Sequence, residues 1–186
     1  MITPVDRLRE YAEEYECRSL CERVLTDWRF PLWSASSKST THHYGMGGLA
    51  KHTLEVVELC FNANDYFNVD DKGVDDMQIF LTAFFHDVGK MWDYKATNPE
   101  MTEWEGTKHK ETIHHISRSV MVWVEEVERA KLDAAYISDE FKDEVSHAIL
   151  AHHGLREWGS PVSPKTKLAW ILHTCDMLSA RMDECQ

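Results

Sequence analysis

The element that most constrains the fold is Phe85-His86-Asp87-Val88-Gly89-Lys90, which ends an apolar run over residues 79–85. A run that is apolar nearly all round predicts a central buried helix, with His86 and Asp87 in its last turn. Other potential metal ligands stand before and after this element, at His52, His115, His152, His153 and Asp176. A single His-Asp pair would mean little. The ordered set indicates a metal centre in a helical core, because burying so many imidazoles without a metal would be costly.

Apolar spacing predicts helices along the whole chain, and no segment has the alternation of a strand. The predicted helices cover residues 5–27, 49–67, 75–88, 111–130, 138–153 and 165–182. The polar stretch 91–110 is predicted to be a long loop, of the kind that often serves as a lid. We therefore expect an all-α fold of about six to seven helices in a single domain over 1–186. Within it, an N-terminal helical segment (1–33) packs on a metal-binding core (34–183).

The composition limits the class of protein further. A net charge of −12 argues against a protein that holds long nucleic acid by charge neutralisation, and favours a small phosphate ester as substrate. The five cysteines form no CxxC pair and are interpreted as reduced thiols. The N-terminus has no signal-peptide pattern, and no apolar run approaches the roughly 20 residues of a membrane span. The prediction is a soluble, cytoplasmic protein with no membrane partner; the sequence does not indicate its oligomeric state.

Two of the ligand pairs, His86-Asp87 and His152-His153, end predicted helices, where the negative end of the helix dipole favours a cation. Gly89 and Gly154 follow them as predicted left-handed caps. If Asp87 bridges, one metal is held by His52, His86, Asp87 and Asp176, and the other by Asp87, His115, His152 and His153. Each metal then keeps positions open for water and substrate. Such ligands suit Mn, Fe, Co, Ni or Zn without choosing among them, so the expected cofactor is a divalent metal, with two ions bound.

Several residues are predicted to contact the substrate or to support the ligands. Lys90 should project toward the metals and hold a phosphate oxygen. Gly48, with Gly47, could offer backbone N–H groups to phosphate at a helix N-terminus, or could simply form a tight turn. His43, with His42, is expected either behind a ligand or in contact with the substrate.

Other histidines and the tryptophans carry weaker predictions. At the third ligand position His115 is preferred, and His114 is interpreted as its neighbour. Isolated histidines are read as ordinary surface or core residues: His109, His147 and His173. Five tryptophans lie in or near predicted loops, where one or two could stack on a base although packing is the better interpretation for most: Trp28, Trp33, Trp92, Trp104 and Trp158.

With these residues the chain resembles the HD-domain superfamily of metal-dependent phosphohydrolases, which implies an HD-domain helical bundle. Within it, the chain is most similar to the HD domain of YhaM-type 3′→5′ exoribonucleases and related relaxase-associated HD domains. The resemblance rests on His42-His43, Gly47 to Val56, His86 to Lys90, His115-Ile116, His152-His153-Gly154, Glu157 to Pro161, Pro164 and Asp176. Two departures stand out: the chain has His114 where that family has glycine, and it has no room for an N-terminal OB-fold RNA-binding domain.

The predicted function is metal-dependent hydrolysis of a phosphoester by a two-metal mechanism, as a phosphodiesterase or nucleotidase. The substrate is expected to be a nucleotide or a short oligonucleotide, including short single-stranded RNA or DNA. Asp87 and Lys90 are the predicted catalytic residues, and the leaving-group acid is not indicated. Two alternatives stay open: an HD-fold di-iron oxygenase, and a non-catalytic module that binds a nucleotide.

Overall fold

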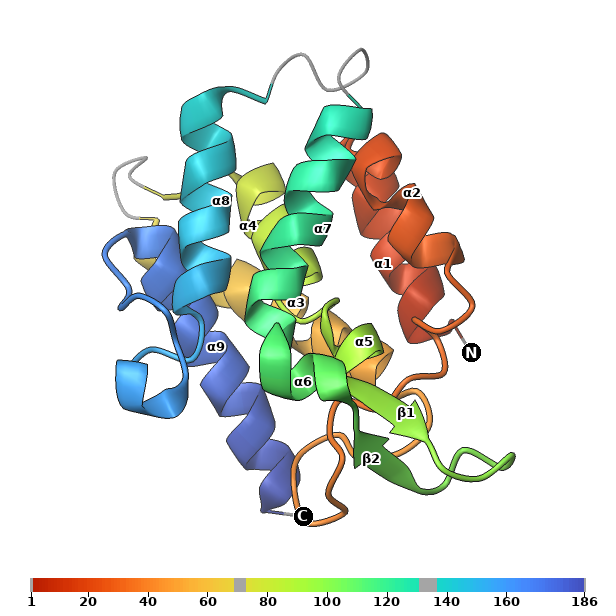
Figure 1. Ribbon diagram of the computed structural model, residues 1–186. Helices are drawn as coiled ribbons and strands as arrows, with labels where there is room; N and C mark the ends of the chain where they lie inside the picture. Colours follow the sequence, from red (N-terminus) through yellow and green to blue (C-terminus); the bar gives the residue numbers. More distant parts are fainter. Residues whose placement is uncertain (1, 69–72, 131–136, 186) are drawn as a thin grey trace.

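Helices form most of the computed structural model, which describes residues 2–68, 73–130 and 137–185 (Figure 1). The long helices are α1 (Pro4–Glu14), α2 (Arg18–Thr26), α3 (Gly48–Phe67), α4 (Asp76–Phe85), α7 (His115–Arg129), α8 (Asp139–Ala151) and α9 (Lys167–Glu184). Shorter elements are α5 (Lys90–Asp93), α6 (Lys108–Thr112), the strands β1 (Tyr94–Ala96) and β2 (Trp104–Gly106), and a 3₁₀ turn over Arg156–Trp158. The all-α prediction is confirmed, and the division at residues 33 and 34 stays a prediction.

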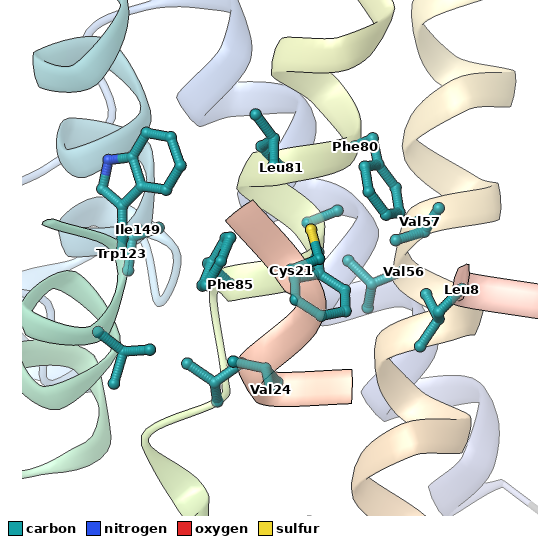
Figure 2. Close-up of a cluster of buried hydrophobic side chains, with 14 of the residues drawn as sticks. Leu8, Cys21, Val24, Val56, Val57, Phe80, Leu81, Phe85, Trp123 and Ile149 are labelled. Atoms are coloured by element: carbon teal, nitrogen blue, oxygen red, sulfur yellow. The ribbon is translucent and has the colours of Figure 1, made fainter. Parts of the chain in front are cut away.

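Helix α4 lies at the centre of the bundle and packs against α3, α7, α8 and α9. Every residue from Gln78 to Phe85 is buried, as the apolar run predicts. Figure 2 shows Phe80, Leu81 and Phe85 of α4 among side chains of α3, α7 and α8. Full burial of one such side chain is worth about 1.5–3 kcal/mol, so α4 is firmly anchored. The chain that follows α4 therefore starts from a rigid support.

The N-terminal segment forms two helices, so the prediction of one helix over 5–27 is wrong. Helix α1 ends in a Schellman motif, in which Cys17 N–H donates to Ala12 O (2.9 Å) and Glu16 N–H to Glu13 O (3.1 Å). Glu16 takes a positive φ of 52°, a conformation that usually goes to glycine. Because the residue at this position is a glutamate and not a glycine, the sequence does not indicate the turn. Both helices still pack on the core, and Arg23 of α2 pairs with the buried carboxylate of Glu126 on α7.

The stretch 91–110 contains structure that the sequence analysis missed. Strands β1 and β2 pair antiparallel, with Lys95 opposite Glu105, so the prediction of no strand is wrong. Strands of three residues are too short to show alternation. The hairpin is fixed on the body by aromatic contacts: the indole N–H of Trp33 donates to Tyr94 O (2.9 Å), and the Trp33 and Trp104 rings meet edge to face. A lid role for this stretch stays a prediction.

The two glycines after the ligand pairs behave differently. Gly154 has a φ of +83°, as predicted for a left-handed cap. The prediction for Gly89 is wrong: its φ is −60°, because the chain runs on into α5. Gly89 is needed for another reason, since an added Cβ would lie 2.2 Å from the carbonyl oxygen of His115. The close approach brings the start of α7 against the turn that carries Asp87.

The remaining predicted helices are confirmed with shifted ends. Ser138 caps α8, as predicted, because its side chain accepts a hydrogen bond from Phe141 N–H. The acidic residues Asp139 and Glu140 follow in the first turn. The segment predicted as one helix over 111–130 divides between α6 and α7, with His114 at the junction. Within the described ranges, no helix is both long and apolar enough to cross a bilayer.

Candidate metal centre

Two groups of ligand-type side chains meet where α4 ends. The first cluster consists of His52 from α3, His86 and Asp87 after α4, and Asp176 from α9. The second cluster consists of His115 at the start of α7 and His152 and His153 after α8. In each cluster, one ligand atom per residue lies within 4.8 Å of all the others. The structure thus brings together all seven residues predicted as ligands.

The carboxylate of Asp87 lies between the two clusters. Its Oδ2 is 3.3 Å from Nε2 of His52 and 3.3 Å from Nε2 of His86. Its Oδ1 faces the other way, 3.5 Å from Nε2 of His115 and 3.7 Å from Nε2 of His152. Each oxygen is therefore directed to a different cluster, which is the arrangement that a bridging ligand requires.

Three histidines are oriented by backbone carbonyls. Nδ1 of His86 donates to Ala83 O (2.7 Å), Nδ1 of His152 to Ile149 O (2.7 Å), and Nδ1 of His153 to Trp158 O (3.0 Å). A carbonyl oxygen only accepts, so the proton of each neutral ring sits on Nδ1. Nε2 is then left with a free lone pair, as a metal ligand needs.

The other two ligand histidines are oriented by side chains. Ser179 Oγ donates to Glu55 Oε2 (3.0 Å), which leaves it to accept from Nδ1 of His52 (3.1 Å). Asp93, fully buried, accepts from both the backbone N–H (2.9 Å) and Nδ1 (3.1 Å) of His115. Its carboxylate raises the basicity of that imidazole. The supporting roles of Ser179, Glu55 and Asp93 were not predicted, because no spacing in the chain indicates them.

Asp93 also holds a histidine that the sequence analysis treated as ordinary. Nδ1 of His109 lies 2.7 Å from Asp93 Oδ1, so His109 is a satisfied, partly buried side chain. Burial would raise the pKa of Asp93, but its hydrogen bonds with His115 and His109 lower that pKa overall. Asp93 therefore stays a carboxylate behind the second cluster.

The first cluster requires positive charge at its centre. Nε2 of His52 and Nε2 of His86 are only 3.3 Å apart, and both carry lone pairs by the orientation argued above. In the absence of a metal a proton fills this role: burial alone would lower the pKa of His86, but Asp87 and Asp176 raise it to about 10. A divalent cation would satisfy the same four ligands and displace that proton.

Two histidines of the second cluster, His115 and His152, are neutral. Burial lowers the pKa of His115 to about 4, despite the opposing effect of Asp93, and lowers the pKa of His152 well below its ordinary value. Nε2 of His115, Nε2 of His152 and Oδ1 of Asp87 are buried and have no hydrogen-bond partner among the described residues. Each such orphan costs about 1–3 kcal/mol. A metal ion is the ligand that accepts all three lone pairs, so these residues fit a divalent cation.

Both clusters open into one cavity of 460 Å³, in the range of small-molecule sites. Four cationic side chains line it in a chain whose net charge is −12: Lys38, Lys90, Lys110 and Arg181. Trp158, 55% exposed, lines this cavity, whereas Trp33 packs against Trp104 of the hairpin. The cavity is thus suited to an anionic ligand beside the metal ligands.

Lys90 is buried at the inner wall of this cavity, with Nζ 2.6 Å from Oδ2 of Asp87. Burial would lower the pKa of Lys90, but the Asp87 carboxylate raises it, so the ammonium stays charged. The same charge helps His86 to keep the pKa of Asp87 well below its usual range despite burial. The predicted phosphate contact of Lys90 stays a prediction.

His43 and Gly48 have other contacts. The His43 side chain is buried with Nε2 2.7 Å from Glu55 Oε2, and His42 is the member of the pair that lines the cavity. The N–H of Gly48 donates to Gly45 O (3.1 Å), and an added Cβ would lie 1.9 Å from His43 O. These contacts support the tight-turn interpretation of Gly48 and a place for His43 behind His52. Direct substrate contacts of both residues stay predictions.

His114 lies beside the second cluster, and the choice of His115 over His114 as the ligand stays a prediction. Its backbone takes φ 68° and ψ 147° at the start of α7. This region is nearly reserved for glycine and costs another residue about 1–3 kcal/mol. The His114 side chain lines the cavity, with its ring centroid 4.2 Å from that of His115 and 6.2 Å from that of His153.

Comparison with known proteins agrees with this geometry. The family model for the HD domain matches residues 49–181. The chain belongs to the HD domain family, and the resemblance found in the sequence is confirmed. A curated relative, the 3′-5′ exoribonuclease YhaM of Bacillus pumilus (strain SAFR-032), is 31% identical over 154 residues, which is 83% of this chain. The match covers 44% of that relative, so the chain spans less than half of its length. No solved structure matches the chain.

Proposed function

We propose that this domain hydrolyses a phosphoester in a nucleotide or short oligonucleotide, using two divalent metals. The observation that carries the proposal is Asp87, whose two carboxylate oxygens face two separate clusters of inward-turned Nε2 atoms. The similarity to a relative named as an exoribonuclease supports phosphoester chemistry.

The donor set divides between two ions. His52, His86, Asp87 and Asp176 would hold one, and Asp87, His115, His152 and His153 the other. Two bound ions supply activation of water at neutral pH and polarisation of the phosphoryl oxygens. Imidazole with carboxylate suits Mn, Fe, Co, Ni or Zn.

The protein's own groups position this chemistry. The Nδ1 partners fix the five imidazoles, and the core around α4 keeps water from their back side. The Lys90 ammonium lies at the cavity wall beside Asp87, where it would contact a phosphoryl oxygen of the substrate. Lys38, Lys110 and Arg181 then attract the anionic substrate.

The cavity favours a small or short substrate. Its volume of 460 Å³ suits a group of nucleotide size, and Trp158 is exposed beside it for stacking on a base. The overall charge of −12 disfavours long nucleic acid held along the surface.

The test is metal analysis of the purified protein, joined to assays of nucleotides and short single strands with Mn²⁺, Fe²⁺ and Ni²⁺. We expect hydrolysis by the wild type and a loss above about 100-fold in Asp87→Ala, since even partners of ligands are worth about 10–100-fold. Glu100→Ala, which removes an exposed carboxylate, is the matched control and should keep full activity.

Three outcomes would contradict the proposal. Full activity in Asp87→Ala would remove the bridging role. Oxygen consumption without hydrolysis would point to the oxygenase alternative. Tight nucleotide binding with no product, at full metal content, would point to a binding module.

A further inference from the structure

One strained residue in the cavity joins α6 to α7 through its backbone, but this role does not require its side chain. His114 is the non-glycine residue at the start of α7, with φ 68°, and its side chain does not cap the helix. Its ring touches those of His115 and His153, and the described residues offer it no hydrogen bond. Strain of this kind persists at sites where it serves function.

A metal-ligand role explains His114 poorly. A nitrogen of His114 does lie within 4.8 Å of ligand atoms of Asp93 and His115. However, Asp93 Oδ2 and His115 Nδ1 are already bonded to each other at 3.1 Å. A metal at that place would break the bond that turns His115 toward the second cluster. The accessible face of the ring is the one that lines the cavity.

We infer that His114 is a substrate-contacting residue, which donates a hydrogen bond to an oxygen of the phosphoester bound beside the second cluster. The inference rests on the proposed function and adds a specificity residue to it. An imidazole carries an N–H donor whether it is neutral or charged, so the contact does not depend on titration of the ring. The position next to His115 puts this donor at the edge of the second cluster, on the cavity side.

The experiment compares His114→Gly, His114→Asn and a matched control, Glu16→Gly, in the Mn²⁺-loaded protein. In both glycine variants, glycine removes the strain of a positive φ. Glu16 is a suitable control because it lies at the turn after α1 and does not line the cavity. The probe is bis(4-nitrophenyl) phosphate, with inorganic phosphate as competitor. Metal content and thermal midpoint are measured alongside kcat and KM.

We expect His114→Gly to lower kcat/KM at least tenfold and to weaken inhibition by phosphate, with unchanged metal content and an equal or higher thermal midpoint. His114→Asn keeps the backbone of a non-glycine residue and a side-chain N–H donor, so it should retain more activity than the glycine variant. Glu16→Gly should raise the midpoint with no change in kcat/KM.

Full activity in His114→Gly would overturn the inference, and so would a loss accompanied by a lower midpoint or lost metal, since that would show a structural role. Equal losses in the asparagine and glycine variants would also overturn it. These results differ from failure of the proposed function, which would appear as an inactive wild type on every phosphoester tried.

Discussion

The two halves of the metal centre share Asp87 but differ in charge. The first cluster adds a second carboxylate, Asp176, and crowds two imidazole nitrogens to 3.3 Å, so it attracts a cation strongly. The second cluster offers three imidazoles and one carboxylate oxygen, which lies 3.5 Å or more from His115 and His152, and these two histidines stay neutral. This difference indicates that a metal must compete with a proton at the first cluster. At the second cluster, His115 and His152 already offer unprotonated nitrogens.

The largest expected effect of this difference is on the pH dependence of metal binding. The pKa of His86 is raised to about 10, so a metal entering the first cluster must displace a proton at neutral pH. Its affinity should rise by roughly tenfold per pH unit from about pH 7 toward 10. The second cluster, where the pKa of His115 is about 4, should be nearly independent of pH in that range. Calorimetric titration with Mn²⁺ at several pH values would separate the two classes; equal slopes would contradict the comparison.

The same shifts predict the stability of the metal-free protein. The raised pKa of His86 stabilises the fold fully at pH values below the ordinary histidine pKa of 6.5. This stability is lost as pH rises through about 10. The lowered pKa of His115 acts at the other end, where stability falls as pH drops from about 6.5 to 4. Thermal midpoints of the apo protein should therefore peak between these limits.

A smaller effect should distinguish the supports of the two clusters. Asp93→Asn removes the charge behind His115 and should weaken metal binding at the second cluster by about 10–100-fold. Ser179→Ala removes only a neutral hydroxyl behind His52 and should cost the first cluster less. Metal titrations of both variants would check the order, and a reversed order would contradict it.

The smallest effect concerns a site outside both clusters. Glu16→Gly should stabilise the fold by about 0.5–1 kcal/mol, because glycine takes the positive φ of the Schellman position without strain. Chemical denaturation measures this gain. A destabilised variant would show that the glutamate side chain is worth more than the strain.

The sequence predicted which ligand-type side chains come together better than it predicted the residues around them. His86, Asp87 and His152 could be found because each follows a helix whose apolar pattern is visible in the chain. Asp93 could not, since its contact with His115 depends on how Gly89 lets α7 approach the turn after α4.

Local turns were hidden for the same reason. Glu16 and His114 take positive φ angles, which their residue types do not indicate. The break in the first helix and the late start of α7 were therefore not predicted. The β1–β2 hairpin depends on Trp33, far away in sequence, which bonds to Tyr94 and packs on Trp104. Long-range packing decided these features, and periodicity alone does not report it.

The central claim is that two ions bind on either side of Asp87. The most direct measurement is diffraction from crystals of the Mn²⁺-loaded protein, recorded at the manganese absorption edge. We predict two anomalous peaks, one within reach of His52, His86 and Asp176 and the other within reach of His115, His152 and His153. A single peak that contacts only one cluster, or none at all, would contradict the account.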